Sequence, residues 1–254
     1  MLVRIIGGHG GVSPKAKATS YLIDGKLLID AGSIAEGTIV DEQIRIDYIL
    51  LSHAHLDHTK DLAFLSDNCF GLKAKPFEVY AHKEVINSLK LHLMNDKIWP
   101  DFTKLPSVEK PTLNFFGLIS EQVIQLGDYK ITPVEVNHPG PGMGFIVECK
   151  NKSLVFTQDT GPTDRIWELA KKQSNLRAIF TEVSFPNHLQ KVATSSQHHT
   201  PNSMKEEIKK MPPDVPIFLG HLKPNHQTKL YQEIEDLGHE RFVILGSDDR
   251  TYLF

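Results

Sequence analysis

The sequence predicts a single α/β domain over residues 1–254, built from two similar halves, with two sheets packed face to face and helices outside. A strand-rich stretch followed by helical stretches occurs twice along the chain, and no composition break, low-complexity tract or short repeat divides it. Hydrophobic residues make up 40% of the chain and charged residues 23%, which is typical of a globular domain with a sizeable core. Polar residues also stand repeatedly at strand ends, where sheet proteins commonly build sites.

The first half opens with an apolar strand that runs into a glycine-rich loop, Gly7-Gly8-His9-Gly10-Gly11. Such a loop suits either a tight turn or a phosphate cradle, and the sequence leaves both open. Asp24-Gly25 between two apolar runs is a strong hairpin signal. The elements predicted here are a strand at 2–6, a hairpin over 21–30, a strand ending at 51, a helix that includes 57–65, a strand at 77–81 and a helix at 83–93, whereas 38–46 is ambiguous.

Residues 95–117 show no sustained periodicity and predict a long irregular insertion. Loops of this length are usually functional or disordered. The second half then resumes the pattern of the first. Its predicted elements are two strands within 123–136, a rigid loop at 138–144, a hairpin of 145–149 with 153–156, a helix at 163–173, a strand at 178–183, a helix at 202–210, a strand at 215–219, a helix at 228–237 and a strand at 242–245.

The stretch from Ser52 to Thr59, Ser-His-Ala-His-Leu-Asp-His-Thr, carries the strongest chemical signal. His53 and His55 follow a buried strand, and their spacing of two points both imidazoles to one side. Asp57 and His58 fall in the first turn of the next helix, which brings them back past the same point. This arrangement predicts two adjacent metal ions, because imidazole and carboxylate groups are the usual ligands of such centres.

Further polar residues follow other predicted strands, and we expect them to meet at the same rim. His53, His55 and His138 would form one metal site, and Asp57, His58 and His221 the second. Asp159 has two carboxylate oxygens and would bridge both metals. Asp30 would accept a hydrogen bond from a ligand imidazole and orient it.

Composition excludes several functional classes. The formal net charge is −3, so nothing suggests a general nucleic-acid-binding surface. Cys69 and Cys149 are distant and predict two reduced thiols rather than a disulfide. The N-terminal apolar run is too short for a signal peptide, and no apolar stretch is long enough for a membrane span, so a cytoplasmic location is expected.

The order of these residues resembles the metallo-β-lactamase superfamily, and within it the class II cyclic-nucleotide phosphodiesterases. Ser52–His58 is similar to the central signature of that class, and Asn95–Phe102 to its characteristic insertion. Glu182–Asn187, Ser196–Pro201 and Gly220–Pro224 resemble later segments. Two departures stand out. Thr59-Lys60-Asp61 replaces a small apolar residue and glycine, and Gln197 and His199 replace glycine and leucine.

The resemblance implies a four-layer αββα sandwich with two divalent metal ions, zinc first and Mn²⁺ or Fe²⁺ as alternatives. It implies hydrolysis of 3′,5′-cyclic AMP or GMP to the 5′-monophosphate, with Asp57 orienting the nucleophile. His198 would donate a proton or bind the phosphoryl group, and its neighbour His199 competes for that role. Asn95 and Trp99 would contact the substrate, with Trp99 or Phe102 as a platform for the base, although Trp99 could equally anchor the insertion. The resemblance also suggests a homodimer.

Three other functions stay open at this level. A tRNA 3′-end endonuclease should carry a basic arm for RNA, and this chain has no insertion rich in lysine and arginine. A lactonase would not need His198. The third is a metal-binding protein that has lost catalysis and acts through interactions, and retention of all seven candidate metal positions argues against it.

Overall fold

The computed structural model describes residues 1–246 and 249–254. Within them, two seven-stranded mixed sheets lie face to face, together with a small two-stranded sheet. The strand order of the first large sheet is β16-β1-β2-β3-β4-β5-β8, and that of the second is β15-β14-β13-β12-β11-β10-β9. Each sheet has an antiparallel part that continues into parallel strands, so the two halves repeat one design.

The first half contains β1 (Leu2–Gly7), β2 (Ser20–Ile23), β3 (Leu27–Ile29), α1 (Ile34–Gly37), α2 (Val40–Gln43), β4 (Tyr48–Leu50), α3 (Leu56–Asn68), β5 (Phe77–His82), α4 (Lys83–His92), β6 (Pro106–Ser107), β7 (Lys110–Pro111) and β8 (Leu113–Leu118). The second half contains β9 (Ile124–Leu126), β10 (Tyr129–Glu135), β11 (Met143–Cys149), β12 (Lys152–Phe156), α5 (Arg165–Ala170), β13 (Leu176–Glu182), α6 (Gln190–Ser195), α7 (Pro201–Glu207), β14 (Ile217–Gly220), α8 (Gln227–Asp236), β15 (Phe242–Ile244) and β16 (Thr251–Leu253).

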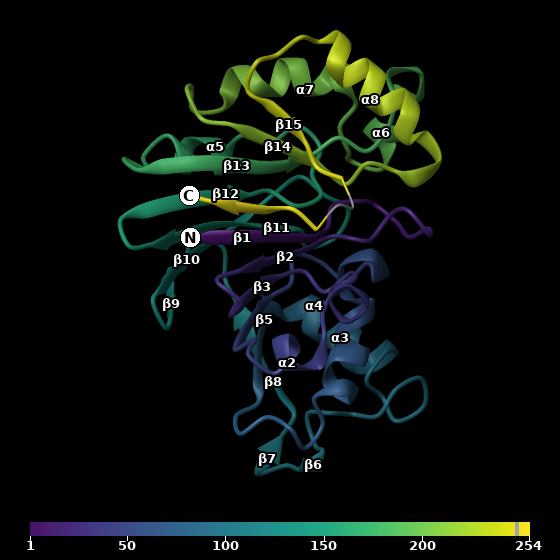
Figure 1. Cartoon of the computed structure of the whole chain (residues 1–254), viewed down its shortest axis with the longest axis vertical. Helices are drawn as coiled ribbons and strands as arrows, with labels where there is room; N and C mark the ends of the chain where they lie inside the picture. Colours follow the sequence, from purple (N-terminus) through teal and green to yellow (C-terminus); the bar gives the residue numbers. More distant parts are fainter. Residues whose placement is uncertain (247–248) are drawn as a thin grey trace.

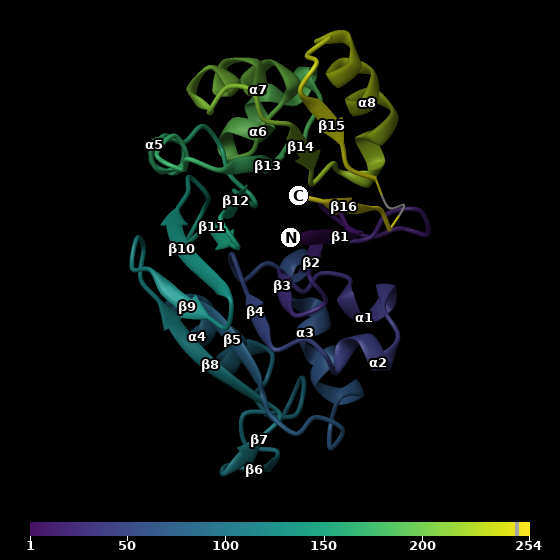
Figure 2. The same ribbon diagram turned by 60° about the vertical axis from the view of Figure 1, so that its left-hand side comes forward.

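Three apolar clusters hold four layers together. The central cluster lies between the sheets, where Tyr21 of the first sheet meets the rings of Phe156 and Phe180 of the second. A second cluster joins the first sheet to α3 and α4, and a third joins the second sheet to α5, α7 and α8. Figures 1 and 2 show these helices on the two outer faces, with the sheets between them. The predicted αββα sandwich is therefore confirmed.

The predicted hairpin over 21–30 forms as β2 and β3, paired antiparallel. Asp24 and Gly25 have φ values of 50° and 68° and are the central residues of a turn closed by a hydrogen bond from the N–H of Lys26 to the carbonyl of Ile23 at 3.0 Å. The predicted hairpins of the second half also form, because β9 pairs antiparallel with β10 and β11 pairs antiparallel with β12.

The predicted irregular insertion is wrong at its C-terminal end. Residues 113–118 form strand β8, which pairs in parallel with β5 at the sheet edge. Its burial does not alternate along the strand, so the period of two that marks a half-buried strand is absent. Strand β16 escaped prediction because it is three residues long. It pairs with β1 and brings both termini together.

Candidate metal centre

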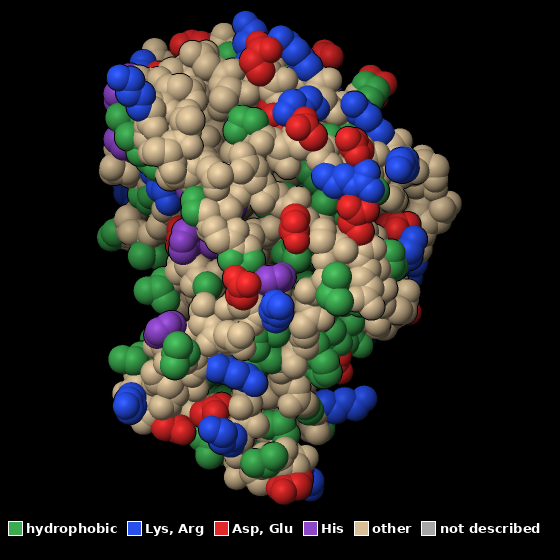
Figure 3. All heavy atoms as spheres, turned by 180° about the vertical axis from the view of Figure 1, so that it is seen from behind, with side chains coloured by type: hydrophobic (Ala, Val, Ile, Leu, Met, Phe, Trp, Pro, Cys, Tyr) green, Lys and Arg blue, Asp and Glu red, His purple; other side chains and the backbone are tan. Residues whose placement is uncertain are grey.

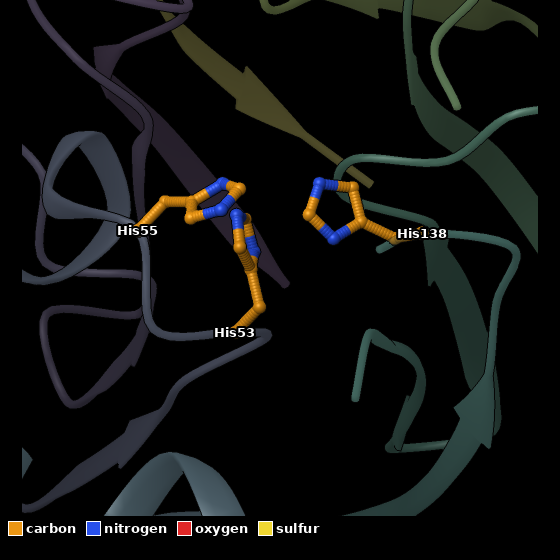
Figure 4. A group of neighbouring side chains, drawn as sticks. All are labelled: His53, His55 and His138. Atoms are coloured by element: carbon orange, nitrogen blue, oxygen red, sulfur yellow. The ribbon is translucent and has the colours of Figure 1, made fainter. Parts of the chain in front are cut away.

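The motif between β4 and α3 lies at the rim where both sheets end. His53 and His55 stand in the short segment after β4, and Asp57 and His58 in the first turn of α3. Across the rim, His138 follows β10, Asp159 follows β12 and His221 follows β14. Figure 4 shows the rings of His53 and His55 on one side and that of His138 approaching from the other half. The site is therefore built by both halves.

Two groups of ligand atoms correspond to the two predicted metal sites. His53, His55 and His138 can place one ligand atom each within 4.8 Å of the others, and so can Asp57, His58 and His221. Asp159 lies between the groups. Its Oδ1 is 3.3 Å from Nε2 of His58, and its Oδ2 is 3.1 Å from Nε2 of His221. A carboxylate in this position could bridge two ions.

A buried carboxylate at the end of β3 orients the histidines of the first half. Asp30 Oδ2 lies 2.6 Å from Nδ1 of His58 and accepts a hydrogen bond from the Ser52 hydroxyl at 2.8 Å. Because Ser52 donates to Asp30, its oxygen can accept from Nδ1 of His53, which lies 2.9 Å away. Both imidazoles therefore keep the proton on Nδ1 and turn Nε2 toward the centre.

The second half repeats this device with a carboxylate at the end of β13. Glu182 Oε2 accepts a hydrogen bond from Ser184 Oγ at 2.6 Å, and Ser184 Oγ lies 2.8 Å from Nδ1 of His221. The other carboxylate oxygen of Glu182 lies 2.8 Å from Nδ1 of His198. One buried carboxylate thus fixes His221 through a serine and His198 directly.

The orphaned atoms at the centre fit a metal ion. The ring nitrogens Nε2 of His53 and His58, both ring nitrogens of His138 and Oδ1 of Asp159 are buried without a hydrogen-bond partner among the described residues. Leaving so many buried polar atoms unpaired would cost free energy unless something else binds them. Neutral imidazole nitrogens and a carboxylate oxygen are donors that suit a divalent transition-metal ion.

Burial and neighbouring charges shift the pKa values of several groups within the centre. Burial lowers the pKa of His138 to about 4, and burial together with the charge of His58 holds the pKa of His53 well below its usual value. Burial opposes ionisation of Asp57, yet the hydrogen bond from His221 lowers its pKa. Burial would also lower the pKa of His198, but the Glu182 carboxylate raises it. Burial would likewise lower the pKa of His58, but the carboxylates of Asp159 and Asp30 raise it well above its usual value. His53 and His138 are thus neutral donors, and Asp57 is ionised.

Comparisons with known proteins agree with this fold and donor set. A model of the beta-lactamase superfamily domain matches residues 27–221, which covers most of the chain and every candidate metal ligand. The chain belongs to the metallo-β-lactamase superfamily. Within the described residues, its His and Asp clusters could bind metal, as expected for a hydrolase of this superfamily.

Several relatives within the superfamily are informative. The chain is 28% identical to a probable 3′,5′-cyclic-nucleotide phosphodiesterase of Yersinia pestis, with 96% of this chain and 87% of the relative covered. The solved structure of unliganded yeast PDE1 superposes with a TM-score of 0.80 at 16% identity and covers 96% of this chain and 97% of its own. The short form of human tRNase Z superposes with a TM-score of 0.69 at 16% identity, covering 100% and 99%. Both superpositions establish a shared metallo-β-lactamase fold.

The neighbouring histidines His198 and His199 have different surroundings in the structure. His198 can place a ring nitrogen within 4.8 Å of ligand atoms of His138 and Asp159. His199 instead directs Nδ1 to Ser203 Oγ at 3.0 Å and belongs to none of the metal-binding groups found among the described residues. Only His198 therefore stands where a bound substrate could meet it, and its role stays a prediction.

The insertion residues predicted to contact substrate have structural partners. Trp99 donates from Nε1 to the carbonyl of Ala63 at 3.1 Å and packs edge-to-face on Phe64. Phe102 is buried in the cluster beneath the first sheet. Asn95 accepts hydrogen bonds from the backbone N–H groups of residues 97 and 98. The contacts of Trp99 anchor the insertion on α3, and the hydrogen bonds that Asn95 accepts stay within the insertion. Substrate contact by Asn95 or Trp99 stays a prediction.

Sequence reasoning assigned no role to Glu182 or Ser184, although both lie in a segment noted for its resemblance to the family. A glutamate at the end of an apolar strand, Ala178–Val183, was the available signal. The partners of Glu182, His198 and His221, are 16 and 39 positions away along the chain. The pairing of β13 with β14 brings His221 to it, and the segment between α6 and α7 brings His198.

Proposed function

We propose that this protein hydrolyses 3′,5′-cyclic nucleotides, cAMP or cGMP, to nucleoside 5′-monophosphates. The observation that carries the proposal is the match, over nearly the whole chain, to a relative that bears this name. The donor groups are compatible with it, because paired divalent ions suit in-line displacement at phosphorus. We propose zinc as the metal, with Mn²⁺ or Fe²⁺ as alternatives, since most donors are imidazole nitrogens. A cytoplasmic location and a homodimer stay predictions.

The ligand residues would hold two divalent ions, which when bound activate water at neutral pH and offset charge on the phosphoryl oxygens. Asp57 is ionised and partly exposed, so it can orient the attacking water by accepting its hydrogen bond. Glu182 lies 2.8 Å from Nδ1 of His198 and raises its pKa against the effect of burial, which favours His198 as the group that would donate a proton to the leaving 3′ oxygen.

A tRNA 3′-end endonuclease remains the rival within the superfamily. Its substrate carries many phosphates, so its surface should gather positive charge. This chain has a net charge of −3, and Figure 3 shows basic and acidic side chains interspersed over one face.

Among the described residues, none of the helices has the length and apolar character needed to cross a bilayer.

Incubation of the metal-loaded protein with cAMP, cGMP, bis-p-nitrophenyl phosphate and a 3′-extended tRNA precursor tests the proposal. We expect 5′-AMP or 5′-GMP as product. Asp57→Ala should reduce turnover by more than about a hundredfold, because both the orienting carboxylate and a ligand are lost. Asp67→Ala, at an exposed position of the same helix, is the matched control and should be fully active. Cleavage of the tRNA or the generic diester without turnover of either cyclic nucleotide would contradict the proposal.

A further inference from the structure

The glycine-rich loop after β1 does not present a phosphate cradle. The N–H groups of His9 and Gly10 are hydrogen-bonded to the carbonyls of Lys17 and Leu222. The loop instead offers its carbonyl oxygens to the segment that follows β14. The carbonyl of Gly8 accepts from the N–H of His221 at 2.6 Å.

The same loop fixes a lysine at the centre. Lys223 donates from Nζ to the carbonyl of Gly10 at 2.9 Å, and its backbone N–H is hydrogen-bonded to the carbonyl of Ser184. Its ammonium lies 3.7 Å from Oδ2 of Asp57, close enough for attraction but too far for a hydrogen bond. Among the described residues, no other lysine or arginine forms an ion pair with a candidate metal ligand.

We infer that Lys223 binds the anionic phosphoryl group of the substrate, with its ammonium held in place by the carbonyl of Gly10. This inference rests on the proposed function, because it assumes that the ligand of the centre is a phosphate ester. The carbonyl of Gly10 is the one hydrogen-bond acceptor found for Nζ among the described residues, which leaves two of its three N–H groups for a ligand. The side chains of Lys223 and Asp57 are each 24% exposed, so both are accessible to an anion from solvent.

The alternative role for Lys223 is a structural clamp between the two loops, and two substitutions distinguish it. Lys223→Gln keeps a donor for the carbonyl of Gly10 but removes the charge, whereas Lys223→Met removes both. Lys223→Arg keeps the charge. Lys229→Met removes an exposed lysine of α8 that faces Glu233 and serves as the matched control.

The experiment measures inorganic phosphate binding to the metal-loaded protein by calorimetry, with metal content determined for each variant. Loss of a charge-assisted contact should weaken phosphate binding about tenfold or more in both Lys223→Gln and Lys223→Met. Lys223→Arg should stay within about threefold of the unaltered protein, and Lys229→Met should match it. Metal content should be the same in all four variants.

Unchanged phosphate affinity in Lys223→Gln would overturn the inference, as would undetectable phosphate binding by the unaltered protein. Metal loss in that variant would also overturn it, because Lys223 would then support the metal site. Turnover is a separate arm. If cyclic nucleotides are substrates, their KM should rise by the same factor while kcat changes less. Absence of cyclic-nucleotide turnover would contradict the proposed function but would not affect the conclusion from phosphate binding.

Discussion

At the scale of single residues, Glu182 is the buried group on which the second half of the centre depends. It contacts His198 directly and His221 through the Ser184 hydroxyl. Glu182→Gln keeps the volume but replaces one acceptor oxygen with an amide that can only donate. We expect kcat for cyclic nucleotides to fall about tenfold to a hundredfold, with weaker metal binding at His221. Steady-state kinetics and metal titration check both effects.

Glu206→Gln is the control for this substitution, since Glu206 is exposed on α7 and pairs only with Lys209 among the described residues. It should leave both measurements unchanged. Equal kcat and metal affinity in Glu182→Gln and the unaltered protein would show that this carboxylate does not position either histidine.

The candidate ligands could be predicted from sequence because their signal is local. His53 to His58 lie within one strand-loop-helix segment, and His138, Asp159 and His221 each follow an apolar strand. Asp30 was predicted to orient an imidazole for the same reason, and it lies 2.6 Å from Nδ1 of His58. Glu182 also ends an apolar strand, but its partners His198 and His221 lie far along the chain, and the sequence alone does not show that they meet it.

At the scale of elements, the loop after β1 controls how closely β14 approaches the centre. A methyl group on Gly10 would lie 2.6 Å from Cε1 of His221, well inside contact distance. Gly10→Ala should therefore displace the His221 ring and weaken binding of the metal held by Asp57, His58 and His221 by about tenfold or more. Competition with a chelator of known affinity measures the loss.

Gly117→Ala is the matched control, because a methyl group at this position of β8 meets nothing within 4 Å. It should bind metal normally. Normal metal affinity in Gly10→Ala would mean that the loop yields and does not set the position of His221. The sequence shows that this loop is rich in glycine, but its role depends on the segment around Lys223, 213 residues further along the chain, which lies against it.

At the scale of the whole molecule, the fold was predictable because hydrophobic periodicity marks most strands and helices. The exceptions are the short helices α1 and α6 and two strands at the edge of the first sheet. Strand β8 lacks alternating burial and β16 is short, and each pairs with the free edge of a neighbouring strand, β5 or β1. Whether such segments form strands is therefore determined by pairing with a neighbouring strand rather than by their local sequence preference.

The centre joins both halves of the molecule, so metal binding should stabilise the whole fold. His53, His55 and His58 come from the first half, and His138 and His221 from the second. An ion that binds only the folded state at about a hundred times its Kd adds about 2.7 kcal/mol. Removing metal with a chelator should therefore lower Tm by about 5–10 °C for a chain of this size. Differential scanning calorimetry of loaded and stripped protein measures the shift.

The control for this last prediction is the double substitution His53→Ala with His138→Ala, which removes ligands contributed by both halves. Its Tm should respond less to the chelator than that of the unaltered protein, because fewer donors bind the ion. Restoring Zn²⁺ to the stripped unaltered protein should recover the original Tm. If stripping leaves Tm unchanged, the unpaired nitrogens of His53, His58 and His138 do not bind a metal that couples the two sheets.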